Sequence, residues 1–151
     1  MTDNNNKIQI FCNGVCYNNG KPEASASWGA VMRMGENHYR EFKSLIYDDF
    51  VTNQRAELYA CVESIKQLKT DEYPVIVYSN SEYMVNCFKE CWYKKWEQDD
   101  WINSAKKPIA NKELWWELLA LWVWFDVKFE YRSDNDPDIK KAQELAKGVL
   151  N

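Results

Sequence analysis

The chain shows two kinds of regular apolar pattern, separated by polar segments. Alternating or continuous apolar residues predict five β-strands, at residues 7–12, 28–33, 38–46, 74–78 and 127–131. Apolar residues three and four positions apart predict four helices, at about residues 52–68, 81–91, 111–124 and 138–149. This order of elements predicts a mixed α/β fold in which helices flank a five-stranded mixed sheet.

Local signals place the helix starts and the turns. Thr52, Ser81 and Asn111 are polar residues of the type that caps a helix N-terminus. Residues 34–37 contain a glycine between two predicted strands and are typical of a hairpin. Residues 13–25 are rich in turn formers, so we expect a loop there after the first strand.

Length and composition indicate one folded domain. The 151 residues suffice for a single core, which we assign to residues 7–151 after a disordered tail at residues 1–6.

A net charge of −4 disfavours a broadly electropositive nucleic-acid binder, although a local basic patch remains open. Five cysteines without a visible secretion signal predict reduced thiols in an intracellular, reducing compartment. No apolar run is long enough to cross a bilayer, so we expect no membrane association.

Six short motifs carry a family resemblance. They read FCNG, WGA, TNQRAEL, YSNSEY, NKELW and AQELA, at residues 11–14, 28–30, 52–58, 78–83, 111–115 and 142–146. In this order and at this spacing they resemble the ribonuclease H type 1 family over nearly the whole chain. The resemblance implies a ribonuclease H-like fold and cleavage of the RNA strand of RNA–DNA hybrids by two divalent metal ions held by four acids.

The positions of those four acids carry mostly amides in this chain. Carried over one by one, they fall on Asn13, Glu57, Asn80 and Gln143, and only Glu57 is a carboxylate. Hard cations such as Mg²⁺ need anionic oxygens, because a neutral amide oxygen offers little attraction to offset dehydration. The family's mobile histidine falls in residues 132–137, which contain none. These departures predict a pseudoenzyme with no active catalytic residue, no bound metal and no cofactor.

One alternative keeps a catalytic site. Three acids lie near the positions of the missing acids in the sequence, namely Asp134, Asp136 and Glu144. Any one of them is a candidate for a relocated metal ligand. A weak, metal-dependent hybrid ribonuclease with rearranged ligands therefore remains open.

A second alternative is binding without cleavage. We call the polar and aromatic segment 92–108 the handle, which is a basic element in many ribonucleases H of this type. Polar, basic and aromatic residues that could touch a nucleic acid are Asn53, Gln54, Lys94, Lys95, Trp96, Lys106 and Lys107. Residues 97–100 at the handle tip are mostly acidic, and acids repel phosphate. Binding of an RNA–DNA hybrid or a structured RNA is therefore expected to be weak.

The predicted helix 111–124 is apolar on both faces. At 100° per residue, one apolar stripe faces the sheet and a second stripe projects from the opposite side. The outer stripe contains Trp116, Leu119, Ala120, Val123 and Trp124. A partner chain, a second copy of this chain, or the handle or C-terminal segment folding back would each cover it.

These observations lead to one main hypothesis. A degenerate metal site, an acidic handle tip and an apolar outer helix face favour a catalytically inactive protein-interaction module, with a protein partner or homo-oligomer bound at residues 111–124. The hybrid or RNA binder and the weak ribonuclease are the alternatives.

Overall fold

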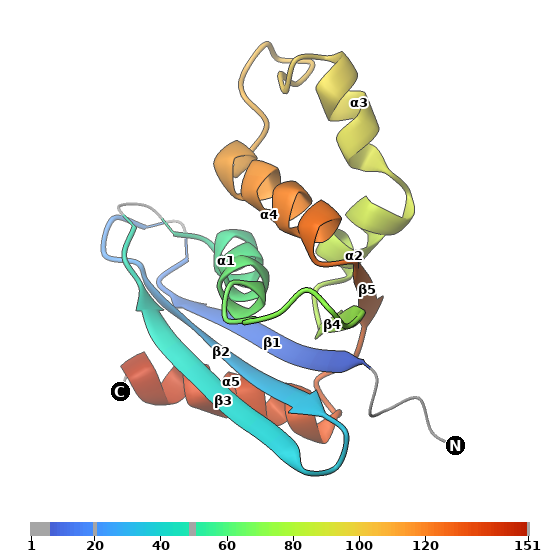
Figure 1. Ribbon diagram of the computed structural model, residues 1–151. Helices are drawn as coiled ribbons and strands as arrows, with labels where there is room; N and C mark the ends of the chain where they lie inside the picture. Colours follow the sequence, from blue (N-terminus) through green and yellow to red (C-terminus); the bar gives the residue numbers. More distant parts are fainter. Residues whose placement is uncertain (1–6, 20, 49–50, 151) are drawn as a thin grey trace.

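The computed structural model describes residues 7–19, 21–48 and 51–150, so the predicted disordered tail at residues 1–6 lies outside the described residues. The elements follow one another along the chain as in Figure 1. They are β1 (Ile8–Tyr17), β2 (Ser25–Met34), β3 (His38–Ile46), α1 (Asn53–Ile65), β4 (Val75–Ser79), α2 (Glu82–Lys89), α3 (Trp92–Gln98), α4 (Lys112–Trp124), β5 (Val127–Tyr131) and α5 (Pro137–Leu150).

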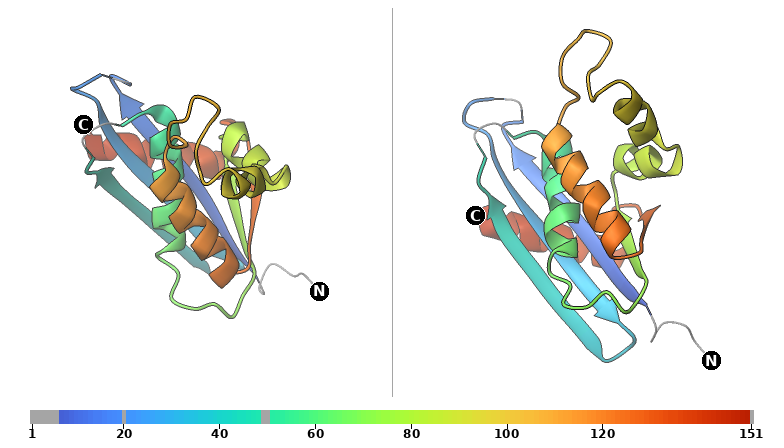
Figure 2. Two further views of the ribbon diagram at one scale, coloured as in Figure 1. Left: turned by 90° about the horizontal axis from the view of Figure 1, so that it is seen from above. Right: turned by 45° about the horizontal axis from the view of Figure 1, so that its top comes forward.

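The strands form one mixed sheet in the order β3-β2-β1-β4-β5. Strand β2 pairs antiparallel with β1 and β3, while β1, β4 and β5 run parallel. Helices α1 and α4 lie on one face of the sheet and α5 covers the other face (Figures 1 and 2). The predicted fold, a five-stranded mixed sheet flanked by helices, is confirmed.

The handle projects from the rest of the fold. Helix α3 and the loop that follows it extend away from the sheet, as the second view of Figure 2 shows. Helix α3 was not predicted as a separate element. Cys91, with a φ of 56°, takes the left-handed conformation and turns the chain between α2 and α3.

Strand β1 is longer than its local sequence predicts. Residues 13–17, expected as a loop, continue the strand because they pair with residues 25–29 of β2. This pairing joins two segments of the sheet, so the turn-forming composition of residues 13–25 does not reveal it.

Two of the three predicted helix caps are confirmed. The Thr52 hydroxyl accepts a hydrogen bond from the backbone N–H of Arg55, and the Ser81 hydroxyl accepts one from Met84, each at 3.2 Å. Asn111 directly precedes α4 as predicted, but its side chain makes no capping bond to the helix. Its Oδ1 instead accepts a hydrogen bond of 3.1 Å from the Arg55 guanidinium, which links the start of α4 to α1.

An aromatic cluster seats α4 and the handle on the fold. Phe88 of α2 stacks on Phe129 of β5 with ring centroids 4.1 Å apart, and it also contacts the ring of Trp115. Trp96 of the handle packs on the other side, 5.3 Å from Trp115 and 5.7 Å from Trp101. The handle is therefore anchored by aromatic contacts to the centre of α4.

Helices long and apolar enough to span a bilayer do not occur in the part of the chain that the structure describes.

Candidate active site

The close approach of α1 to β1 brings the backbone of Glu57 next to Gly14, the residue that follows Asn13. Asn13 lies on β1 and is 3% exposed, and Gly14 follows it directly. A Cβ atom on Gly14 would lie 2.2 Å from the backbone oxygen of Ala56. Only glycine permits this contact, so the end of the first turn of α1, directly before Glu57, rests on the backbone of β1.

Glu57 is a half-buried carboxylate with an altered acidity. Burial raises the pKa of Glu57, a hydrogen bond with the Ser81 hydroxyl opposes that shift, and the charge of Asp134 adds to it. The influence of Ser81 and Asp134 shows that the end of β4 and the loop after β5 both lie near this carboxylate.

Asn80 and Asp134 meet at the carboxyl ends of two parallel strands. Asn80 follows β4 directly, and its Nδ2 donates a hydrogen bond of 2.7 Å to Oδ1 of Asp134. The backbone N–H of Arg132 donates to the carbonyl of Ser79 at 2.9 Å, which holds the loop after β5 beside β4. Asp134 therefore contacts Asn80, which is one of the positions where this chain carries an amide in place of an acid.

Gln143 reaches the same region from the opposite face of the sheet. A Cβ atom on Gly29 would lie 2.3 Å from the carbonyl oxygen of Ala142, so α5 contacts the backbone of β2 there. Gly29 is the cross-strand partner of Asn13. Gln143 is thus on the turn of α5 that crosses β2 beside Asn13, and it is partly buried.

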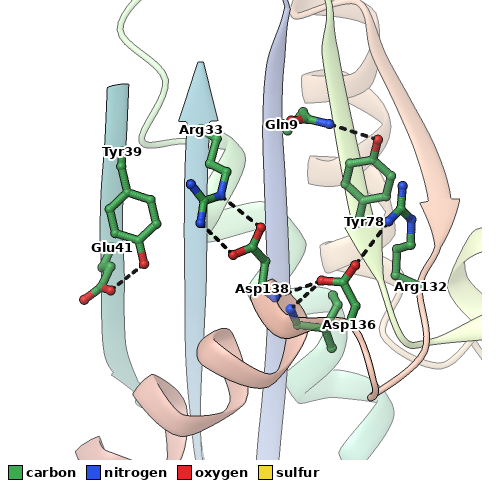
Figure 3. Close-up of polar contacts among 9 residues, drawn as sticks. Gln9, Arg33, Tyr39, Glu41, Tyr78, Arg132, Asp136 and Asp138 are labelled. Carbon is green, nitrogen blue, oxygen red and sulfur yellow. Dashed lines mark hydrogen bonds and ion pairs between the residues drawn. The ribbon is translucent and has the colours of Figure 1, made fainter. Parts of the chain in front are cut away.

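The two other candidate acids differ in their surroundings. Oδ1 of Asp136 accepts hydrogen bonds from the backbone N–H groups of Asp138 and Ile139, at 2.9 and 3.1 Å, so Asp136 caps α5 (Figure 3). Its other oxygen pairs with Arg132 at 3.1 Å. Glu144 is exposed on α5. Of the three acids considered as relocated ligands, Asp134 is the one that contacts a site position.

The start of α5 is fixed by a second acid. The Asp138 carboxylate accepts two hydrogen bonds of 2.9 Å from the Arg33 guanidinium on β2, which Figure 3 shows as a paired contact. This bidentate pair sets the position of α5, and hence of Gln143, on the sheet.

The donor atoms do not fit a cage for paired divalent cations. Within residues 7–19, 21–48 and 51–150, no three His, Cys, Asp or Glu side chains are grouped to hold a metal ion. Nδ2 of Asn13 and Oδ1 of Asn80 are buried and have no hydrogen-bond partner in the structure. An amide N–H repels a cation but attracts an anionic oxygen. The donor set therefore does not match the paired cations that the family resemblance implies, and the chemistry considered for this site is that of its own side chains.

The predicted nucleic-acid contacts fall into two groups. Asn53 and Gln54 are exposed on the first turn of α1, and the backbone N–H of Asn53 is bonded to Oδ1 of Asn19 at 2.8 Å. The lysines of the handle are exposed, on α3 and on the loop after it; they are Lys94, Lys95, Lys106 and Lys107. Trp96 is half-buried in the aromatic cluster, so packing accounts for its presence in the handle.

The outer stripe of α4 is covered in part by the handle. The indole of Trp101 meets that of Trp116 edge to face at 5.8 Å, which leaves Trp116 49% exposed. Leu119 is partly buried and packs against the core, while Ala120 is exposed. Val123 and Trp124, at 79% and 70% exposed, lie beyond the handle.

Comparison with known proteins identifies the family. A sequence model of the RNase H family matches residues 5–133. The chain belongs to the ribonuclease H family. The Ribonuclease H of Caldanaerobacter subterraneus subsp. tengcongensis is 34% identical over 145 residues, covering 90% of this chain and 86% of that protein. The Ribonuclease H of Chlorobium luteolum is 36% identical over 147 residues, covering 95% of each.

Solved ribonuclease H structures share the fold. LC11-RNase H1 in complex with RNA/DNA hybrid superposes with a TM-score of 0.71 at 20% identity, covering 95% of this chain and 96% of that chain. LC9-RNase H1, described as a type 1 RNase H with the type 2 active-site motif, gives 0.75 at 20% identity, covering 95% and 71%. A foamy viral protease-reverse transcriptase gives 0.82 at 19% identity, covering 99% of this chain and 20% of the viral chain.

These relatives correct the main functional prediction. The prediction of a catalytically inactive protein-interaction module is wrong, because the ribonuclease H proteins that match most of this chain are named as enzymes. The sequence left open which of Asp134, Asp136 and Glu144 could stand in for a missing acid. The fold brings Asp134 to the site through its hydrogen bond with Asn80, a contact that the sequence does not reveal.

Proposed function

We propose that this chain binds RNA–DNA hybrids and cleaves their RNA strand slowly, at a site built around Glu57 and Asp134. The observation that carries the proposal is the contact between Asp134 and Asn80, which gives the edge beside Glu57 a second carboxylate. The family relatives named Ribonuclease H support the reaction class. The complex of LC11-RNase H1 with an RNA/DNA hybrid supports the substrate class.

The side chains at this site offer acid–base chemistry. Hydrolysis of a phosphodiester requires a group that accepts a proton from the attacking water. Burial raises the pKa of Glu57, which brings this carboxylate closer to the range where a general base works best. Glu57 is therefore the candidate base, and Asp134 is the second carboxylate that can hold the water.

The amides suit a different task from the acids that they replace. A scissile phosphate carries negative charge, and preorganised N–H donors stabilise charge that develops on its oxygens. Asn13 supplies an unpaired amide N–H at the site. Hydrogen-bond donors stabilise phosphate charge less than paired cations do, so slow turnover is expected.

Cleavage is tested with a labelled RNA strand annealed to DNA. The protein should release RNA fragments from the hybrid and leave the same RNA, alone or in a DNA-free duplex, intact. Glu57→Gln and Asp134→Asn should each lower the rate at least tenfold, whereas Asp71→Asn, an exposed acid in the loop before β4, should not change it. Each reaction is run with Mg²⁺, with Mn²⁺ and with a chelator. Equal rates for wild type and Glu57→Gln, or no cleavage under any condition, would refute the proposed reaction.

Binding is tested separately by fluorescence polarisation of the labelled hybrid. Lys94→Ala with Lys95→Ala removes two exposed charges from α3 and should weaken binding and flatten its salt dependence. Lys140→Ala with Lys147→Ala removes two exposed charges from α5, on the opposite face of the sheet, and serves as the matched control. Equal losses in both double variants would show that the handle lysines have no special role.

A further inference from the structure

Three sulfur atoms from separate elements converge in the core behind the site. Sγ of Cys12 on β1 lies 3.4 Å from Sγ of Cys61 on α1, and Sγ of Cys61 lies 3.0 Å from Sδ of Met84 on α2. All three side chains are buried, at 1%, 0% and 1% exposure. Hydrophobic packing accounts for each sulfur by itself, but it does not require Cys61 to contact both of the others.

Formation of a disulfide does not suit this arrangement. An S–S bond of about 2.05 Å would require Cys12 and Cys61 to approach by more than 1 Å. The backbones of α1 and β1 are already in contact at Gly14, where even a Cβ atom would lie 2.2 Å from Ala56. Helix α1 therefore cannot move closer to β1 at this point, and a disulfide would require the two cysteine side chains to rotate within the packed core.

A small separation produces the geometry of metal coordination. With sulfur–metal distances of about 2.3 Å, three sulfurs in a plane lie about 4 Å apart. The flexible thioether of Met84 can retreat most of that distance without moving a helix. Thiol and thioether sulfurs are soft ligands, which select Cu⁺ over hard cations.

The charge of the cluster also favours a monovalent ion. When one thiol loses its proton to the solvent, the resulting thiolate carries one negative charge, which balances the single positive charge of Cu⁺. A Zn²⁺ ion would need a fourth ligand, and the described residues provide no larger group of His, Cys, Asp or Glu here.

We propose that Cys12, Cys61 and Met84 form a buried, three-coordinate site for a soft monovalent metal ion of the Cu⁺ class. The site is separate from the proposed hybrid cleavage site, although Cys61 follows Glu57 by one turn of α1.

The proposal is tested by anaerobic titration with Cu⁺ against a coloured Cu⁺ chelator. The background is a variant with Cys16→Ser, Cys87→Ala and Cys91→Ser, in which Cys12 and Cys61 are the remaining cysteines. It should withdraw one Cu⁺ per chain from the chelator. Met84→Leu in this background conserves volume and removes one ligand, so it should weaken binding at least tenfold. The complementary variant, Cys12→Ala with Cys61→Ala, should lose this site while its circular dichroism stays that of a folded protein.

Three results would overturn the proposal. The first is failure of the folded background variant to compete for Cu⁺. The second is unchanged affinity in Met84→Leu. The third is a copper X-ray absorption spectrum with nitrogen or oxygen neighbours in place of three sulfurs.

Discussion

Replacement of Gly14 by alanine tests how closely α1 must approach β1. The added Cβ would lie 2.2 Å from the oxygen of Ala56, 2.3 Å from its carbonyl carbon and 2.7 Å from the nitrogen of Glu57. All three atoms belong to the backbone, so no side-chain rotation relieves the clash. The first turn of α1 has to move away from β1, and it takes Glu57 with it.

The expected loss of stability follows from this displacement. Ordinary contact distances require α1 to retreat by about 1 Å, and overpacking of this kind costs about 1–3 kcal/mol or more. The first two turns of α1 bury Ala56 and Leu58, so their packing is weakened as well. We expect Gly14→Ala to lower the free energy of unfolding by about 3 kcal/mol and Tm by about 6–12 °C.

Urea unfolding monitored by tryptophan fluorescence measures this change. Gly148→Ala is the matched control, because a Cβ atom there meets nothing within 4 Å and the residue lies inside α5. Alanine should stabilise that helix by about 0.5 kcal/mol or more. Hybrid cleavage by Gly14→Ala should fall at least tenfold even where the protein is fully folded. A Gly14→Ala protein within about 0.5 kcal/mol of wild type would refute the close-contact argument.

Three further substitutions test other parts of the structure. Burial raises the pKa of Glu57 in the folded state, so the ionised carboxylate destabilises the folded protein once the pH rises above the pKa that Glu57 has in the unfolded chain. Glu57→Gln should therefore be more stable than wild type at about pH 7 but not at about pH 3, and urea titrations at both pH values measure this difference. Leu118→Ala empties a fully buried position of α4 and should cost about 2–5 kcal/mol, whereas Val123→Ala on the exposed side should stay within about 0.5 kcal/mol of wild type by thermal melting. Asp138→Asn weakens the partly exposed pair with Arg33 and should cost about 1 kcal/mol at low salt and less at high salt; a loss independent of salt would argue against an ionic contribution.

Local sequence determined much of the fold. The strand predicted at residues 127–131 matches β5, and the caps at Thr52 and Ser81 were readable because a capping bond joins residues three apart. The extension of β1 and the role of Asn111 were not readable in this way. One depends on pairing with β2 and the other on Arg55, which is 56 residues away.

The site shows the same division. The motifs around Asn13, Glu57, Asn80 and Gln143 predicted a shared location through the family resemblance, but they did not identify which nearby acid would join it. That depended on the loop after β5, where Asp134 bonds to Asn80 and Asp136 caps α5 instead.

The sequence alone therefore determined the order of the strands and of the four predicted helices, the helix starts at Thr52 and Ser81 and the loss of three acids, because each of these is recorded in residues close together in the chain. The tertiary structure decided the contact of Asp134 with Asn80, the cover of Trp116 by Trp101 and the meeting of Cys12 with Cys61. These contacts join residues 54, 15 and 49 positions apart. Only the packing of helices on a sheet brings such residues together, and no local pattern encodes their distance.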